Sequence, residues 1–88
     1  MKLSNNFSLK EMTTSQTAER KGINNTPNEA QLLELTKLCG NILQPIRNHY
    51  RTPVTISSGF RSEELCVAIG SSVKSQHAKG QAADFEIF

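Results

Sequence analysis

The sequence predicts an α+β domain in which N-terminal helices pack on a small antiparallel sheet. Two patterns favour this class. Apolar residues recur every three or four positions between residues 32 and 50, which is typical of one face of a helix. Two later segments, 54–57 and 83–87, alternate apolar and polar residues, which is typical of half-buried strands. At 88 residues the chain has room for one domain, which we assign to residues 1–88.

Capping signals predict two short helices near the N-terminus. Ser8 and Glu11 have the spacing of a capping box, in which each side chain bonds the other residue's backbone amide. A second short helix is expected from Ser15 to Lys21, ending at Gly22 because glycine adopts a positive φ without strain.

One long helix should supply most of the apolar core. Thr26 is its expected N-cap, with Pro27 in the first helical position and Glu29 completing a capping box. The apolar pattern continues to Tyr50, so the helix should be about 24 residues long. Pro45 cannot donate a hydrogen bond to the preceding turn, and we expect a kink near residues 41–45.

The second half of the chain predicts a strand, a helix, a loop and a final strand. Ser62 should cap the helix, and Leu65, Cys66 and Ile69 should form its buried side. Residues 71–81 are rich in Ser, Lys, Gln and Gly and are expected to form a loop. With no third strand in the pattern, we expect the C-terminal strands of the sheet to be missing, because a two-stranded sheet is marginal alone.

Composition narrows the range of functions. The net charge is +2 and the ten basic residues are spread along the chain, so a nucleic-acid-binding function is not favoured. No apolar segment has the length of a signal peptide core or a membrane span, which predicts synthesis in the cytoplasm and no membrane partner. Cys39 and Cys66 fall within apolar helical patterns and are expected to be buried free thiols, although a single disulfide stays possible.

The last eighteen residues hold the pattern with most chemistry. Ser75, His77, Gly80, Ala82 and Asp84 combine two types of zinc ligand with small residues that allow a tight return of the chain. Gly80 permits the turn, and Ala82 lies on the same face of the strand as Asp84 and leaves space for an ion. On spacing alone the evidence for a metal site is weak, because a lone histidine in a polar loop is more often a solvated residue and Asp84 could be a surface residue of a strand.

Several segments resemble one known family. SSGFRS (57–62) and SQHAKGQAADFEI (75–87) are similar to the zinc D,D-peptidases. This family groups D-Ala-D-Ala carboxypeptidases, vancomycin-resistance D,D-dipeptidases and phage cell-wall peptidases, and is related in fold to the hedgehog signalling domain. FSLKEM, TSQTAERKGINNTP and NILQPIR are similar to its small, phage-type members, so the resemblance covers nearly the whole chain.

The resemblance implies a site and a function. His77 and Asp84 match the first two zinc ligands, Arg61 the arginine that stabilises the scissile carbonyl, and Ser75 a residue near the bound substrate. The implied function is zinc-dependent hydrolysis of peptidoglycan peptides, beside D-alanine, at the bacterial cell wall. The residues taken by themselves allow other roles: Arg61 could pair with Glu64 on the surface, and Ser75 could be a loop or cap residue without contact to substrate. His49 lies upstream of the motif and matches no ligand.

The sequence also departs from the family pattern. The third family ligand is a histidine well downstream of the aspartate, preceded by a carboxylate that acts as general base, and neither follows Asp84 here. Glu86 is too close to Asp84 to match that base. We therefore expect a truncated fragment that binds zinc weakly, has little activity alone and can self-associate through an exposed sheet edge. The alternative is a non-catalytic module that binds wall peptide or a partner protein.

Overall fold

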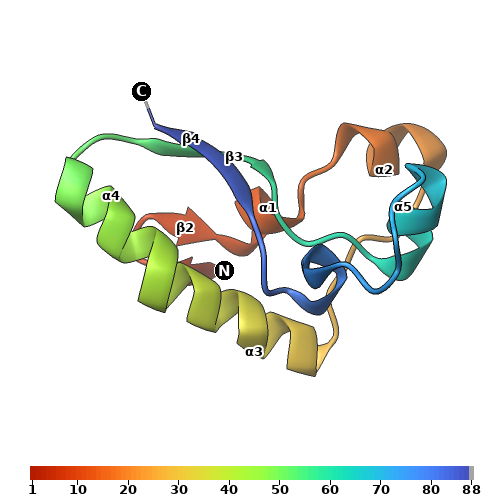
Figure 1. The fold of residues 1–88 in the computed structure, drawn as a ribbon, viewed down its shortest axis with the longest axis horizontal. Helices are drawn as coiled ribbons and strands as arrows, with labels where there is room; N and C mark the ends of the chain where they lie inside the picture. Colours follow the sequence, from red (N-terminus) through yellow and green to blue (C-terminus); the bar gives the residue numbers. More distant parts are fainter. Residues whose placement is uncertain (88) are drawn as a thin grey trace.

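A computed structural model of the chain describes residues 1–87 and confirms the α+β class. Helices α3 and α4 form a long rod along one side of the molecule, and the two-stranded sheet of β3 and β4 lies over its α4 half (Figure 1). The elements are β1 (Lys2–Ser4), β2 (Phe7–Ser8), α1 (Leu9–Thr13), α2 (Gln16–Lys21), α3 (Glu29–Leu38), η1 (Cys39–Leu43), α4 (Gln44–Tyr50), β3 (Val54–Ser58), α5 (Glu63–Ala68), η2 (Gln76–Lys79) and β4 (Asp84–Ile87).

An N-terminal hairpin precedes the helices, and the expectation of helices first and only two strands was wrong on this point. Strands β1 and β2 pair antiparallel and are only three and two residues long. Elements this short do not show a period of two, so the sequence pattern missed them. Leu3 and Phe7 anchor the hairpin because both side chains are buried in the core.

The first two helices begin as predicted, and the second also ends as predicted. Ser8 Oγ accepts a hydrogen bond from the Glu11 amide at 3.2 Å, and Glu11 Oε1 accepts from the Ser8 amide at 3.2 Å. Helix α2 is capped by Ser15 and ends at Gly22, where φ is 65°. The capping residues therefore fix the chain direction at the start of each helix.

The long helix begins later than predicted, because Asn28 and not Thr26 is its N-cap. Asn28 Oδ1 accepts from the Gln31 amide and Gln31 Oε1 accepts from the Asn28 amide, both at 2.8 Å. The expected distortion near residues 41–45 is present as the π-helical turn η1, in which the Gln44 amide donates to the Cys39 carbonyl. Pro45 follows as the second residue of α4.

Strands β3 and β4 pair antiparallel, although α5 and η2 lie between them in the chain, with Ile56 opposite Phe85 and Ser58 opposite Asp84. Its register shifts between Ile56 and Ser58, at the end of the sheet where Asp84 lies. Irregularities of this kind are frequent next to active sites, where they redirect a side chain.

Two expectations for residues 62–81 need correction. Ser62 caps α5 as predicted, but the helix ends at Ala68 and Ile69 is 42% exposed, not buried. The segment 71–81 is not a simple loop, because Gln76–Lys79 forms the 3-10 helix η2. A four-residue turn carries no apolar periodicity, so its composition alone suggested a loop.

A single core joins the helical rod to both two-stranded sheets. Cys39 and Cys66 are both buried and free. Within residues 1–87 the structure contains no helix with the length and apolar character needed to cross a membrane. The buried residues of the central cluster are Leu3, Phe7, Met12, Leu35, Cys39, Leu43, Val54 and Phe60.

Candidate metal centre

His77 is held by a short turn that is capped at both ends. Ser75 Oγ accepts from the His77 amide at 3.2 Å, and Gly80 ends the turn in the left-handed region with φ of 75°. The turn is docked on the first turn of α3, where Gln31 Nε2 donates to the Ala78 carbonyl at 3.1 Å. A β-carbon at Gly80 would lie only 2.6 Å from the Gln31 carbonyl oxygen, so this close packing requires glycine.

The imidazole of His77 has a fixed orientation. Its Nδ1 lies 2.7 Å from the carbonyl oxygen of Gly59. A carbonyl oxygen can only accept, so Nδ1 carries the hydrogen and donates, and in the neutral ring Nε2 keeps its lone pair. A backbone carbonyl on the second ring nitrogen is the usual support of a metal-binding histidine. The Gly59 contact therefore presents Nε2 as a potential ligand.

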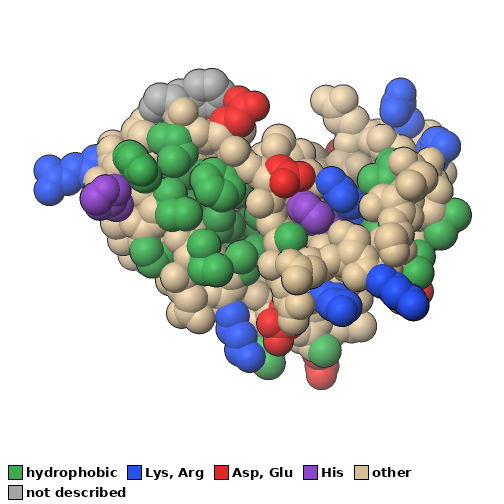
Figure 2. Space-filling view, viewed as in Figure 1, with side chains coloured by type: hydrophobic (Ala, Val, Ile, Leu, Met, Phe, Trp, Pro, Cys, Tyr) green, Lys and Arg blue, Asp and Glu red, His purple; other side chains and the backbone are tan. Residues whose placement is uncertain are grey.

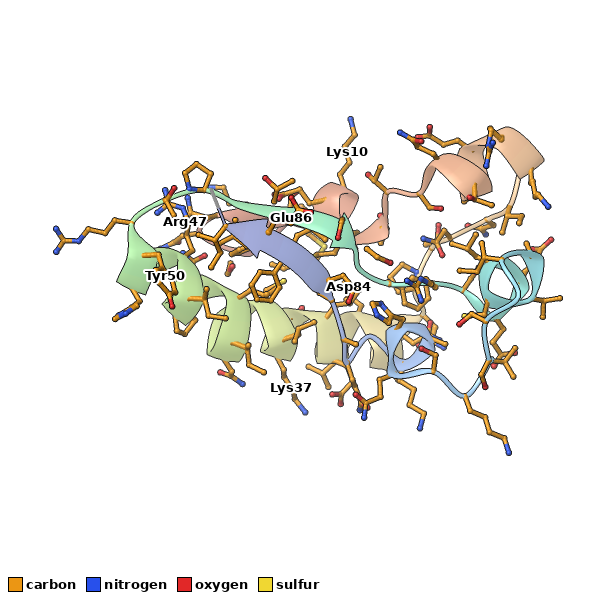
Figure 3. All side chains as sticks on the ribbon, turned by 45° about the horizontal axis from the view of Figure 1, so that its top comes forward. Lys10, Lys37, Arg47, Tyr50, Asp84 and Glu86 are labelled. Atoms are coloured by element: carbon orange, nitrogen blue, oxygen red, sulfur yellow. The ribbon has the colours of Figure 1, made fainter. Side chains whose placement is uncertain are left out.

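Asp84 and Arg61 complete the cluster. Asp84 Oδ2 lies 3.6 Å from His77 Nε2 and 3.7 Å from an Arg61 guanidinium nitrogen. The side chains of His77 and Arg61 are 13% and 21% exposed and that of Asp84 is 63% exposed, so the cluster opens to solvent on the carboxylate side. Figure 2 shows a histidine, an acidic and a basic side chain together in the middle of one face, and Figure 3 places Asp84 at the start of β4.

Arg61 is oriented by contacts on both its backbone and its side chain. Its Nε donates to Ser58 Oγ at 3.0 Å, at the end of β3, and its amide donates to the His77 carbonyl at 3.2 Å. The ion pair that the structure forms joins Arg61 to Asp84, not to Glu64 as in the alternative considered from sequence. The guanidinium therefore lies beside the two candidate ligands.

The separation of the two donor atoms suits a shared cation. A distance of 3.6 Å between His77 Nε2 and Asp84 Oδ2 is long for a direct hydrogen bond. Two ligands about 2.0–2.2 Å from a tetrahedral zinc ion are about 3.3–3.5 Å apart, so a small inward shift would allow both to bind. Within residues 1–87 no group of three His, Cys, Asp or Glu side chains is placed to hold a metal ion. The described residues thus fit two of the three protein positions of a catalytic zinc site.

The other candidates from the sequence have different places. Ser75 caps η2 through its hydroxyl, as the alternative reading of this residue held, and its contact with substrate stays a prediction. His49 is exposed near the end of α4, with its ring 4.9 Å from that of Tyr50. Sequence reasoning did not identify Gly59 or Gln31, because a backbone carbonyl and a docking contact leave no chemical signature in the sequence.

A cavity of about 490 Å³ adjoins the cluster on the Arg61 side. It lies between the end of β3, the α1–α2 junction and α5, and Arg61 is the charged residue of its lining. Its volume is in the range of pockets that bind small ligands. The polar part of its lining comes mainly from the hydroxyl side chains of Thr14, Ser15, Thr17, Ser57 and Ser58.

A small α+β domain that brings a histidine, a carboxylate and an arginine together beside a cavity has part of the arrangement of a metal-dependent hydrolase. The comparisons with known proteins define the family. The family Peptidase M15 matches residues 5–88, and the chain therefore belongs to it. Membership gives the chain a peptidase function of the metallopeptidase type in general terms. Neither the search of curated proteins nor the search of solved structures found a match.

Proposed function

We propose that the chain hydrolyses a peptide bond in bacterial cell-wall peptides, beside a D-alanine residue, with zinc as its cofactor. The observation that carries this proposal is the convergence of His77 and Arg61 on Asp84, each within 3.7 Å of its carboxylate, at one end of the β3–β4 sheet. Membership of Peptidase M15 supports the reaction class. The choice of wall peptide as substrate rests on the resemblance of the residue 57–62 and 75–87 segments to D,D-peptidases.

Each residue of the cluster would have a distinct part in the reaction. His77 Nε2 and Asp84 Oδ2 would hold the metal, and the Gly59 carbonyl would keep the imidazole in the correct tautomer. Zinc, when bound, would polarise the scissile carbonyl of the substrate and lower the pKa of a water molecule. Arg61 carries a fixed positive charge toward which the developing oxyanion of the substrate would be directed.

The cavity beside Arg61 is the proposed place of the peptide. Among the described residues its lining offers hydroxyl groups and one cation and includes no carboxylate, so it suits a neutral or anionic segment better than a basic one. A short peptide that ends in a free carboxylate has this character. Solvent exposure of Asp84 on the open side would let the rest of a long wall peptide extend out of the site.

A second candidate is a non-catalytic module that binds wall peptide or a partner protein. The number of converging donors favours it, because two donors come together among residues 1–87 whereas a catalytic zinc site has three protein ligands. Such a module would keep the cavity and Arg61 but would not cleave the peptide. The two candidates differ in turnover and agree in peptide binding.

Zinc titration tests the metal centre. We expect His77→Ala and Asp84→Ala each to weaken zinc affinity at least tenfold, while His49→Ala, which removes the other histidine, leaves it unchanged. Competition with a chelating dye at pH 7 gives the dissociation constants. Equal affinity in all four proteins would remove the metal hypothesis.

A second measurement separates the two candidate functions. Release of D-alanine from a peptide that ends in D-Ala-D-Ala is followed by chromatography, with zinc present and with the L-Ala-L-Ala peptide as control. Cleavage of the D-peptide supports the peptidase. Saturable binding of that peptide without cleavage supports the non-catalytic module.

A further inference from the structure

Asn25 makes three hydrogen bonds around the segment that carries Arg61. Its Nδ2 group donates to the Thr13 carbonyl at 2.8 Å and to the Phe60 carbonyl at 3.0 Å. Its Oδ1 accepts from the Ser62 amide at 2.6 Å. The partners Phe60 and Ser62 are the two chain neighbours of Arg61, so one side chain bonds the backbone on both sides of it.

The segment 59–62 depends on such contacts because it lies outside regular structure. Strand β3 ends at Ser58 and helix α5 begins at Glu63. Two other backbone bonds support the segment, from the Phe60 amide to the Met12 carbonyl at 2.7 Å and from the Arg61 amide to the His77 carbonyl at 3.2 Å. Asn25 lies in the connection between α2 and α3, residues 22–28, and its bonds tie the segment 59–62 to this connection. Through its bond to the Thr13 carbonyl it also links the segment to the end of α1.

The three contacts require the particular chemistry of asparagine. Both Nδ2 hydrogens and the Oδ1 acceptor are used in one planar group. Aspartate has the same shape but would place a carboxylate oxygen against two carbonyl oxygens. Glutamine carries the same groups on a side chain one methylene longer, and an alanine removes all three bonds.

We propose that Asn25 is a positioning residue that sets the place of the Arg61 guanidinium relative to Asp84 and His77. Its effect on the reaction rests on the proposed function, whereas its effect on the Arg61 segment rests on the hydrogen bonds alone. Asn25 itself is half-buried and acts through the backbone of its neighbours in space.

Amide hydrogen exchange measured by NMR tests the structural part. In Asn25→Asp we expect the amides of Arg61 and Ser62 to exchange at least tenfold faster, while amides in the middle of α3 keep their wild-type rates within twofold. Asn24→Asp is the matched control, because Asn24 is exposed and its Oδ1 accepts only locally, from the Thr26 amide at 3.1 Å. Uniform acceleration of all amides would overturn the proposal, since that is the mark of general destabilisation.

A measurement on the unchanged protein covers the case in which Asn25→Asp does not fold. The Nδ2 hydrogens of Asn25 should exchange at least tenfold more slowly than those of exposed Asn24, because both are bonded to backbone carbonyls. Equal exchange of the two side chains would overturn the proposal.

Activity measurements test the link to Arg61. Asn25→Asp should lower kcat/KM for the D-Ala-D-Ala peptide at least tenfold in the wild-type background and less than twofold in an Arg61→Lys background. The same loss in both backgrounds would show that Asn25 does not act through Arg61. If the wild-type protein cleaves no wall peptide, the proposed function fails, and the exchange rates still decide whether Asn25 holds the Arg61 segment.

Discussion

Gly80→Ala tests how η2 is held against α3. Gly80 has φ of 75°, and an added β-carbon would lie 2.6 Å from the Gln31 carbonyl oxygen and 3.2 Å from the Leu35 side chain. The left-handed conformation costs a non-glycine residue about 1–2 kcal/mol. The forced contact adds about 1–3 kcal/mol, as overpacking does in cores. The expected loss in the free energy of unfolding is the sum of these two costs, about 2–5 kcal/mol.

Gly70→Ala is a matched control for this substitution. Gly70 also has φ of 75°, but nothing lies within 4 Å of its added β-carbon. Gly70→Ala should therefore lower the free energy of unfolding only by the cost of the left-handed conformation, about 1–2 kcal/mol. Urea unfolding followed by circular dichroism gives both values, and in a domain of this size 1 kcal/mol corresponds to about 4–8 °C in Tm.

The comparison also has a functional readout. If the methyl group that Gly80→Ala adds pushes η2 away from α3, His77 moves with it, and zinc affinity should fall in Gly80→Ala and not in Gly70→Ala. Equal losses of stability and unchanged zinc affinity in both variants would refute the close docking of η2 on Gln31.

Two further predictions concern stability. Gln44→Ala should lower the free energy of unfolding in urea by about 2–4 kcal/mol, because buried Gln44 bonds Ser4, Asn6 and Asn48. The control Asn48→Ala removes only one of these bonds and should cost about 1 kcal/mol. Similar losses in the two variants would contradict the view that Gln44 ties the N-terminal hairpin to α4. Burial, reinforced by the Glu11 carboxylate, raises the pKa of the Cys39 thiol from 9.0 to about 11, so the folded state holds its proton more tightly than the unfolded chain. The protonated Cys39 thiol therefore contributes up to about 2–3 kcal/mol to the free energy of unfolding, and this contribution is complete below pH 9 and is lost as pH rises toward 11. Cys39→Ala should remove this part of the pH dependence of the urea midpoint.

Local signals in the sequence predicted the elements that depend on local physics. The capping residues of α1, α2 and α5 and the distortion near Pro45 follow from backbone groups that neighbouring side chains satisfy. The start of α3 was predicted two residues too early, because Thr26 with Glu29 and Asn28 with Gln31 both have the capping-box spacing, and the structure uses the second pair.

The sequence allowed us to name the residues of the candidate site, but not the groups that hold these residues in place. His77, Asp84 and Arg61 were named from a motif and a family resemblance, and the structure brings them together. The groups that hold them are a carbonyl of Gly59 and the carboxamide of Asn25, far away in the sequence. No periodicity records such long-range contacts, although asparagine in a connection often bonds backbone groups.

The π-helical turn η1 changes the rotation of α4 about the axis of the long rod relative to that of α3. A π turn accommodates one residue more than an α turn, and each residue advances an α-helix by about 100°. Deletion of one residue at Gly40 or Asn41 would restore a regular helix and rotate everything after it by that angle. Gln44 would then leave the N-terminal hairpin, while Gln31 and its hold on η2 would stay in place. The π turn therefore sets the rotation of α4, with its contact to the N-terminal hairpin, separately from that of α3, with its contact to η2.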